Sequence, residues 1–420
     1  MQPEKPVLYG VNVGVENGKI VFVDEREFAK NTRIIDGTDK VLIPGLYNCH
    51  THVAMTLLRG CGADLALEDW LFKHIFPAEK KLTPELIRLG TTLAIAEMIA
   101  SGTTAFTDMY FNVDVVAEVV DKAGVKANLS NAVISLGQDN YDFQKDPVRE
   151  QTLRVLCDYH QRDDGRIKAE VAIHGVYTSD EKTWRQVLEF AQERNLGLQL
   201  HLAETKTEQE NCVAKYRLTP TQVFLKNGVF DLPVTAAHCV WVTDEDIEIL
   251  TDKNISVAHN PISNLKLASG LAPVSKMLAK NINVALGTDG MASNNSHDLF
   301  EEIKMASLLQ KYAGSDPTVL PALEVLKMAT VNGARAQRRE REGGMIAEGH
   351  DADLVLLDFH SPRQTICHDL ISNLAYSTTG RDVAMTLCQG KILYENGEYK
   401  TIDIEKVLAE AKKAARIFTQ

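Results

Sequence analysis

The chain has 420 residues, of which 45 are basic and 57 acidic, so its formal net charge is −12. This balance repels phosphate backbones and anionic lipid surfaces, and we therefore expect neither nucleic acid nor a membrane as a partner. Hydrophobic residues make up 45% of the chain and charged residues 24%, which is typical of a folded globular protein. The length exceeds the roughly 250 residues of a single α/β barrel and leaves room for a second, small domain.

The N-terminal segment and the cysteines indicate a cytoplasmic protein. Residues 1–5 lack the basic-then-apolar order of a signal peptide, and no apolar run reaches the ~18 residues of a membrane span. The seven cysteines form no C-x-x-C pair, and their odd number suits reduced thiols. Cys49 and Cys239 adjoin histidines of the candidate site, but strand alternation should turn both thiols away into the core.

Both ends of the chain have the pattern of antiparallel strands. Residues 7–24 predict a hairpin that turns at Asn17-Gly18, and residues 352–357, 383–387 and 392–394 predict further strands with a turn at Asn396-Gly397. Neither end holds enough strands for a core of its own. We therefore expect residues 1–44 and 345–420 to form one small β-sandwich domain built from both chain termini.

Between the ends, strands alternate with helices. Thr83-Pro84 predicts the start of a helix that runs from Glu85 to Ser101 and stops at Gly102. The strand that carries His50 is followed by strands near residues 104–108, 125–133, 167–174, 197–201, 234–238, 255–259 and 283–289. Eight strands predict a (β/α)8 TIM-like barrel over residues 45–344. An open doubly wound sheet is the alternative, but no Gly-rich phosphate turn follows the first strand.

Two histidines one residue apart, His50 and His52, follow the apolar run 41–43 and point to one face of a strand. This arrangement supplies half of a tetrahedral metal site, although two polar residues at a strand end are the simpler alternative. In a parallel barrel the C-terminal strand ends form the active-site face. The residues expected to converge there are His50, His52, His174, His201, His238, His259 and Asp289.

The motifs at these strand ends resemble the amidohydrolase superfamily. They are Pro44-Gly45 before His50-x-His52, His201-Leu202-Ala203-Glu204, His238-Cys239, His259-Asn260-Pro261 and Gly287-Thr288-Asp289-Gly290. The segments between them, residues 55–60, 69–71, 77–79 and 289–295, are similar to the branch of 5'-methylthioadenosine and S-adenosylhomocysteine deaminases. Triazine hydrolases and guanine deaminases are near relatives of that branch.

The resemblance implies that His50, His52, His201 and Asp289 bind one divalent ion, most simply zinc, with Fe²⁺ or Mn²⁺ as alternatives. Such a ligand set leaves room for a water, whose pKa zinc lowers to ~7. Binuclear relatives usually carry a carboxylated lysine at the end of strand 4, whereas this strand ends in His174. One metal is therefore expected.

The resemblance also implies catalytic roles. Glu204 would pass a proton to the ring nitrogen next to the attacked carbon, although a solvated glutamate at a helix start is the alternative. His238 would orient the attacking hydroxide, with a second metal site as the alternative, and Asp289 would accept the water's proton. His259 would be structural.

Substrate contacts are implied for Glu79 and His174, and Trp70 could form an apolar wall; packing or solvation is the alternative for each. Many S-adenosylhomocysteine deaminases have an arginine where this chain has Asn131, and Arg149 from the following loop is a possible replacement.

We therefore expect a metal-dependent hydrolytic deaminase that converts the 6-amino group of an adenine nucleoside to a 6-oxo group and ammonia. The candidate substrates are 5'-methylthioadenosine, S-adenosylhomocysteine, adenosine and 5'-deoxyadenosine. A triazine (chloro)hydrolase or a guanine deaminase with the same site is the alternative enzyme, and a non-catalytic scaffold is the alternative from another class. A homo-oligomer would be in keeping with the frequency of symmetric assemblies.

Overall fold

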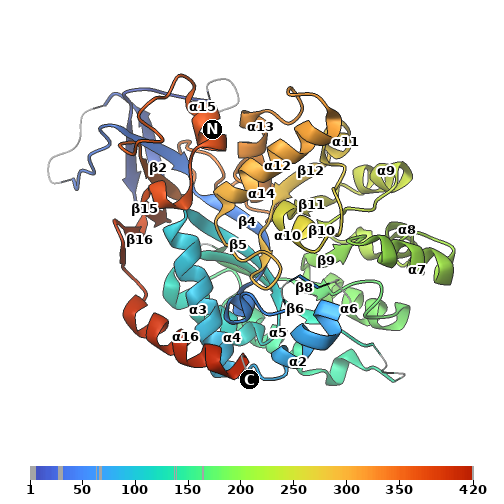
Figure 1. Cartoon of the computed structure of the whole chain (residues 1–420). Helices are drawn as coiled ribbons and strands as arrows, with labels where there is room; N and C mark the ends of the chain where they lie inside the picture. The colour runs from blue at the N-terminus through green and yellow to red at the C-terminus, as the bar shows by residue number, and fades with distance from the viewer. Residues whose placement is uncertain are drawn as a thin grey trace.

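A parallel barrel surrounded by helices forms the centre of the protein (Figure 1). The computed structural model describes residues 6–26, 32–62, 64–65, 69–136, 138, 140–162 and 165–418. The barrel strands are β4 (Leu46–His52), β5 (Thr103–Tyr110), β6 (Lys126–Val133), β7 (Ile167–Ala169), β8 (Val171–Ile173), β9 (Leu198–Leu202), β10 (Val234–His238), β11 (Ser256–His259), β12 (Asn283–Leu286) and β13 (Asp289–Gly290). The predicted TIM-like barrel is confirmed.

The last barrel strand is interrupted, and the interruption closes the barrel. The sequence predicts one strand over residues 283–289, but β12 pairs with β11 while β13 pairs with β4. Gly287 lies at the break, where a Cβ atom would stand 2.8 Å from the backbone nitrogen of His50. Only glycine allows this close approach, so the last strand can reach the first at the level of the candidate ligands.

The fourth strand is divided as well. It was expected to run over residues 167–174, but β7 and β8 flank Glu170, and His174 lies just beyond β8. The Glu170 carboxylate accepts hydrogen bonds from Asn128 Nδ2 and Gln199 Nε2, both at 2.8 Å, and from Arg338 at 2.9 Å. The division thus accommodates a buried polar network inside the barrel.

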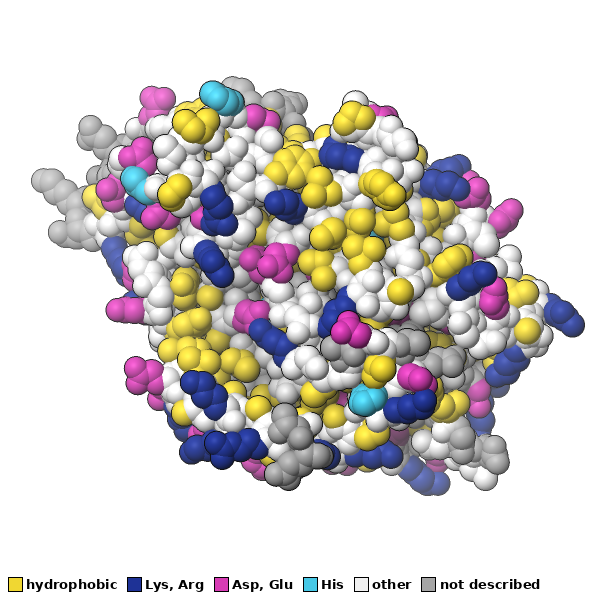
Figure 2. All heavy atoms as spheres, in the orientation of Figure 1, with side chains coloured by type: hydrophobic (Ala, Val, Ile, Leu, Met, Phe, Trp, Pro, Cys, Tyr) yellow, Lys and Arg dark blue, Asp and Glu magenta, His cyan; other side chains and the backbone are white. Residues whose placement is uncertain are grey.

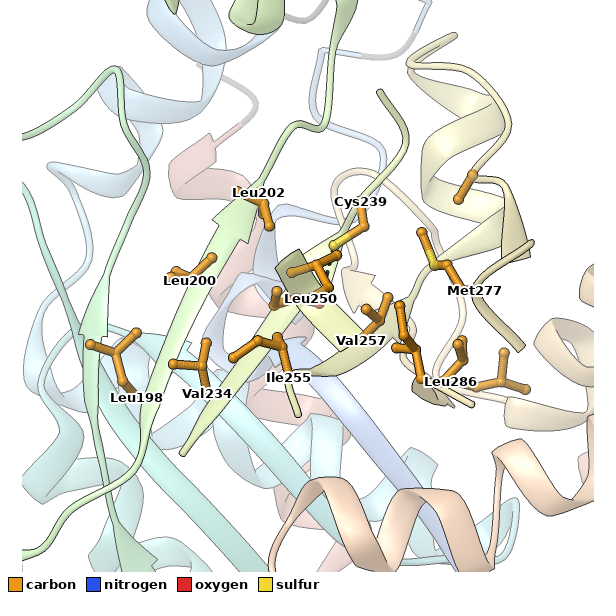
Figure 3. Close-up of a cluster of buried hydrophobic side chains, with 14 of the residues drawn as sticks. Leu198, Leu200, Leu202, Val234, Cys239, Leu250, Ile255, Val257, Met277 and Leu286 are labelled. Carbon is orange, nitrogen blue, oxygen red and sulfur yellow. Dashed lines mark hydrogen bonds between the residues drawn. The ribbon is translucent and has the colours of Figure 1, made fainter. Parts of the chain in front are cut away.

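Strand alternation separates the core from the interior of the barrel. On β9, Leu198, Leu200 and Leu202 face the surrounding helices, where they belong to the large hydrophobic cluster drawn in Figure 3. Gln199 and His201 must face the opposite side, because successive side chains on a strand alternate. Apolar residues therefore fill the space under the helices, and the polar residues of the same strand point into the barrel.

The helices of the barrel domain follow the strands in chain order. They are η1 (Val53–Leu58), η2 (Trp70–Ile75), α2 (Phe76–Glu79), α3 (Pro84–Ala100), α4 (Val113–Ala123), η3 (Phe143–Lys145), α5 (Pro147–Asp158), α6 (Glu181–Arg194), α7 (Lys206–Tyr216), α8 (Pro220–Lys226), η5 (Val229–Asp231), α9 (Asp244–Asp252), α10 (Pro261–Lys266), α11 (Val274–Ala279), α12 (Leu299–Gly314), α13 (Ala322–Met328) and α14 (Val331–Ala336). Thr83 caps α3 as expected, since its side chain accepts a hydrogen bond from Leu86 N. Within the described ranges, no helix combines the length and apolar character needed to cross a bilayer.

Segments from both ends of the chain form the predicted β-sandwich. A five-stranded antiparallel sheet has the order β17-β16-β15-β14-β3, and β1 and β2 form a separate ribbon. The strands are β1 (Asn12–Glu16), β2 (Lys19–Asp24), β3 (Lys40–Pro44), β14 (Leu354–Asp358), β15 (Val383–Cys388), β16 (Lys391–Glu395) and β17 (Glu398–Tyr399). The hairpin turns at Asn17-Gly18 and Asn396-Gly397 are confirmed, and all four residues have the positive φ that such turns require.

The five-stranded sheet has two buried faces. On β14, Leu354 and Leu356 pack with Ile20 of the ribbon, whereas Val355 and Leu357 belong to the core that the barrel shares. Of the last helices, α15 (Leu370–Tyr376) packs on α13, and α16 (Ile404–Phe418) lies along α3 (Figure 1). The boundaries at residues 44/45 and 344/345 stay a prediction.

A buried lysine joins the barrel to the terminal sheet. Lys126 Nζ on β6 lies 2.5 Å from Asp351 and 2.6 Å from Asp353, and all three side chains are almost fully buried. The half-exposed Lys19 of β2 makes a further ion pair with Asp351. On the molecular face shown in Figure 2, by contrast, basic and acidic side chains are interspersed and exposed.

We predict that Lys126→Met lowers the free energy of unfolding by about 3–5 kcal/mol, because it leaves the buried Asp353 without its cation. Denaturant unfolding of the wild type and the variant measures this difference. The matched control is Lys122→Met, whose exposed ammonium pairs with Glu118 on the surface of α4 and should change stability by less than about 1 kcal/mol. Equal unfolding midpoints for the two variants would contradict the proposed anchor.

Candidate active site

A cavity opens at the C-terminal ends of the barrel strands. Most of the predicted site residues line it: His52, Trp70, Glu79, His174, His201, Glu204, His238 and Asp289. His50 is buried next to them, with its ring centroid 4.9 Å from those of His52 and His201. The structure therefore brings together side chains that lie as far apart in the sequence as His50 and Asp289.

Four side chains direct their donor atoms toward one point. Asp289 Oδ1 lies 3.5 Å from His50 Nε2 and 3.2 Å from His52 Nε2, and the Nε2 atoms of His52 and His201 are 3.4 Å apart. Ligands bound tetrahedrally to one zinc at ~2.1 Å are separated by about 3.4 Å. His50 Nε2 is also buried, and no atom of the described residues forms a hydrogen bond with it. The donors of His50, His52 and Asp289 all lie within 4.8 Å of one another, as do those of His50, His201 and His238, so the cluster as a whole can hold a divalent ion.

Hydrogen bonds from the surrounding backbone and side chains orient these donors. His52 Nδ1 donates to the carbonyl oxygen of Met109 at 2.5 Å, and His201 Nδ1 donates to that of His174 at 2.6 Å. Each ring thus presents its Nε2 atom to the cluster. Asp289 Oδ2 accepts bonds from the hydroxyl groups of Ser263 at 2.6 Å and Ser293 at 3.1 Å, which leaves Oδ1 toward the histidines.

The electrostatics favour a cation at this point. Burial lowers the pKa of His50 to about 4 and holds that of His201 well below its ordinary value, so both imidazoles are neutral and suited to bind metal. Burial also acts against ionisation of Asp289, but the neighbouring imidazoles of His50 and His52 keep the pKa of its carboxyl well below its usual range. Burial lowers the pKa of His52, but the Asp289 carboxylate more than offsets this effect and the pKa is raised to about 9. The carboxylate that holds this proton would hold a metal ion in the same place.

Glu204 and His238 stand beside the donor cluster. Glu204 Oε2 lies 3.9 Å from His238 Nε2, and Glu204 Oε1 accepts a bond from Ser269 Oγ at 3.3 Å. His238 Nδ1 donates to Asn264 Oδ1 at 2.8 Å, so His238 Nε2 is left as an acceptor. Burial raises the pKa of Glu204 and so favours its protonated form. The solvated alternative for Glu204 is wrong, because this side chain is buried.

Three residues at this mouth adopt left-handed backbone conformations. The φ angles are +47° at Ala203, +72° at His238 and +62° at Asp289. Such angles are uncommon for residues other than glycine and carry a local energetic cost. Each of these residues lies at or just beyond the end of a barrel strand, so the strained backbone redirects the chain where a side chain must face the cavity.

The other predicted contact residues line the outer part of the cavity. Glu79, at the end of α2, accepts a 2.7 Å hydrogen bond from the hydroxyl group of Tyr110. Burial raises the pKa of Glu79 to about 7, although the Tyr110 bond opposes this effect. His174 donates to or accepts from Thr178 Oγ1 at 3.1 Å, and Trp70 belongs to an apolar wall.

Three residues discussed for the site do not line the cavity. His259 is fully buried with both ring nitrogens unpartnered among the described residues. Asn131 accepts a bond from Val113 N at 3.1 Å and donates to the carbonyl oxygen of Val148 at 3.2 Å, so its amide is used within the scaffold. The guanidinium of Arg149 lies over the ring of Phe190, 5.7 Å from its centroid. Arg149 therefore does not replace the missing arginine.

Several residues near the site did not stand out in the sequence. Ser263 and Asn264 lie on α10, directly after His259-Asn260-Pro261, and bond Asp289 and His238 respectively. That motif was expected only to shape the mouth. The short polar side chains that follow it are the feature of the sequence from which these contacts could have been predicted. Tyr110 and Tyr177, which also line the cavity, had no distinguishing pattern. As expected, Cys49 and Cys239 are buried away from the site.

Known deaminases are similar to this protein over nearly the whole length of the chain. A 5-methylthioadenosine/S-adenosylhomocysteine deaminase of Thermoanaerobacter pseudethanolicus is 44% identical over 100% of this chain and 97% of its own length. A 5'-deoxyadenosine deaminase of Methanosarcina acetivorans is 44% identical over 99% of this chain and 95% of its own. The crystal structure of a zinc-bound adenosine deaminase from Xanthomonas campestris superposes with a TM-score of 0.91 at 34% identity, covering 98% of this chain and 95% of that one.

The model of the amidohydrolase family matches residues 41–393, which include every strand of the barrel and all residues of the donor cluster. Together with relatives at this level of identity over nearly their full length, this match establishes that the chain belongs to the amidohydrolase family.

Proposed function

We propose that this protein is a metal-dependent hydrolytic deaminase of adenine nucleosides. The observation that supports this function most directly is the position of Glu204, a buried carboxyl group of raised pKa beside His238 and the donor cluster. The names of the relatives support the same reaction, because those given above are deaminases of adenine nucleosides. Neither a triazine substrate nor a non-catalytic role is favoured by any feature of the cavity.

We assign His50, His52, His201 and Asp289 as the ligands of one divalent ion. Zinc is the first choice, since neutral imidazole and carboxylate donors at this spacing suit it and the adenosine deaminase of known structure has bound zinc. When bound, such an ion lowers the pKa of a coordinated water and supplies hydroxide near neutral pH.

Three side chains of the chain itself would carry the proton transfers. His238 Nε2 accepts a hydrogen bond from the attacking water and orients it toward C6 of the adenine ring. Glu204 gives a proton to N1, which removes the negative charge that addition at C6 would otherwise place on the ring. Asp289 takes up the water's proton, which then passes to the 6-amino group. The C6–N bond breaks, the remaining proton of the attacking water passes from the C6 hydroxyl to the Glu204 carboxylate, and ammonia and the 6-oxo nucleoside leave.

The outer cavity is suited to the rest of a nucleoside. We propose that Glu79 and His174 contact the ribose and the purine, and that Trp70 covers one side of the bound substrate. The Glu79 carboxyl is already held by Tyr110, so it can accept a hydrogen bond from a sugar hydroxyl without further ordering.

The far end of the cavity favours substrates with an uncharged 5' substituent. No lysine or arginine lies among the described residues that line the cavity, and the outer wall includes Trp70, Leu71, Ile75, Phe76, Phe111 and Ile134. A charged carboxylate placed against such a wall would lose its hydration without gaining an ion pair. We therefore propose 5'-methylthioadenosine and 5'-deoxyadenosine as better substrates than S-adenosylhomocysteine.

We predict that Glu204→Gln lowers kcat by about 10²- to 10⁴-fold, because the amide cannot supply the proton to N1. Metal content, measured by elemental analysis of the purified variant, should stay that of the wild type. Glu210→Gln on the exposed side of α7 is the matched control and should keep full activity. A Glu204→Gln enzyme with near-normal turnover would refute the assigned role.

Removal of the metal should abolish turnover. We expect about one equivalent of divalent metal per chain in the purified protein, loss of activity after dialysis against a chelator, and recovery when Zn²⁺ is added back. Two tightly bound equivalents would contradict the single-ion site, and activity that survives complete metal removal would contradict the mechanism.

A panel of nucleosides tests the substrate preference. We expect kcat/KM for 5'-methylthioadenosine and 5'-deoxyadenosine to exceed that for S-adenosylhomocysteine by at least ~10-fold, which corresponds to about 1.4 kcal/mol in transition-state binding. Ammonia release and the fall in absorbance at the adenine maximum report turnover. Equal values for all three would contradict the proposed wall, whereas no turnover of any nucleoside would contradict the function itself.

A further inference from the structure

A second glutamate holds the backbone that carries Glu204. Glu208, in the first turn of α7, accepts hydrogen bonds from Glu204 N at 2.7 Å and from Ala203 N at 3.3 Å. Each amide is bound by a different oxygen of the same carboxylate. Glu208 therefore spans the turn between the candidate ligand His201 and the candidate proton donor Glu204.

This bonding differs from the usual role of a glutamate at that position. Thr205-Lys206-Thr207-Glu208 has the Thr-x-x-Glu pattern of a capping box, in which the glutamate bonds the amide of the N-cap threonine. Helices α8 and α9 begin with such a reciprocal box, formed by Thr219 with Gln222 and by Thr243 with Asp246. In α7 the Thr205 side chain does cap Glu208 N, but the Glu208 carboxylate reaches back past Thr205.

The burial of Glu208 indicates that the bond to the turn is more than a means of stabilising the helix. The side chain is 6% exposed, and no lysine or arginine in the described ranges lies within ion-pair distance of it. Burial raises its pKa to about 7, and the nearby charge of Glu204 adds to this effect. A buried carboxylate without a cation costs stability, whereas the exposed start of a helix can be capped at no such cost.

The same turn is held from the opposite side by the segment that follows the next strand, β10. The carbonyl oxygen of Ala203 accepts bonds from Val240 N at 3.1 Å and Trp241 N at 2.8 Å. Ala203 is thus fixed at both its amide and its carbonyl group in a left-handed conformation with φ of +47°. The carboxyl group of Glu204, one residue later, is placed by this turn between Ser269 and His238.

We propose that Glu208 is a positioning residue for Glu204: its two carboxylate oxygens fix the Ala203 and Glu204 amides and so hold the Glu204 carboxyl in place for proton transfer. The inference rests on the proposed deaminase function. A carboxylate is suited to the task because two amide donors require two acceptor atoms. A glutamine offers one acceptor, and its NH₂ group would face the second amide.

The variant Glu208→Gln tests this role. We expect kcat to fall by about 10- to 100-fold with little change in KM, since a small displacement of a reacting group costs rate more than binding. Metal content and the thermal midpoint should stay those of the wild type. Hydrogen–deuterium exchange of peptides covering residues 202–206 should become faster, because one amide of the turn loses its acceptor.

Glu210→Gln is the matched control, because Glu210 is exposed two residues along α7 and forms a surface ion pair with Lys206. It should leave kcat and the exchange rates unchanged. Wild-type kcat in Glu208→Gln would overturn the inference, as would a loss of kcat that accompanies loss of bound metal or a lowered thermal midpoint. If the wild-type protein deaminates no nucleoside, the proposed function fails, while faster exchange in Glu208→Gln would still support the structural part of the inference.

Discussion

The chemistry of this protein depends on three imidazole groups and one carboxylate that point toward each other at buried positions. Asp289 Oδ1 stands 3.2 Å from His52 Nε2 and 3.5 Å from His50 Nε2, and the Nε2 atoms of His52 and His201 stand 3.4 Å apart. Among the described residues, His50 Nε2 has no hydrogen-bond partner. Leaving a buried polar atom unpaired costs about 1–3 kcal/mol. A bound cation would interact with all four donors at once. The cost of burying unpaired donors in the polypeptide alone would then be offset by the free energy of metal binding.

The barrel can maintain this arrangement because the strands are anchored elsewhere. The outward side chains of β9 and its neighbours pack under the helices, and Lys126 ties β6 to Asp351 and Asp353 beside the terminal sheet. The strand ends are then free to adopt unusual backbone angles, as at His238 and Asp289. The fold thus holds the reacting groups on a rigid scaffold and confines the strained backbone to the mouth of the barrel.

Helices that follow the strands supply a second set of contacts around the site. Ser263 and Asn264 on α10 bond Asp289 and His238, and Glu208 on α7 bonds the turn that carries Glu204. Helix α7 begins just after β9, which bears His201, and α10 begins just after β11. The ends of the strands thus provide the reacting groups, and the helices α7 and α10 orient them.

The sequence alone determined the parallel barrel and, except for His259, the histidines and the aspartate that meet at its mouth. These features follow from periods of two and 3.6 residues and from the H-x-H spacing, which are encoded over short stretches. Only the tertiary structure decided that His259 stays outside the cavity, that Arg149 packs on Phe190, and that Glu208 bonds the turn before its own helix. These contacts depend on how the closed barrel and its helices pack, and local sequence patterns do not specify distances between separate elements.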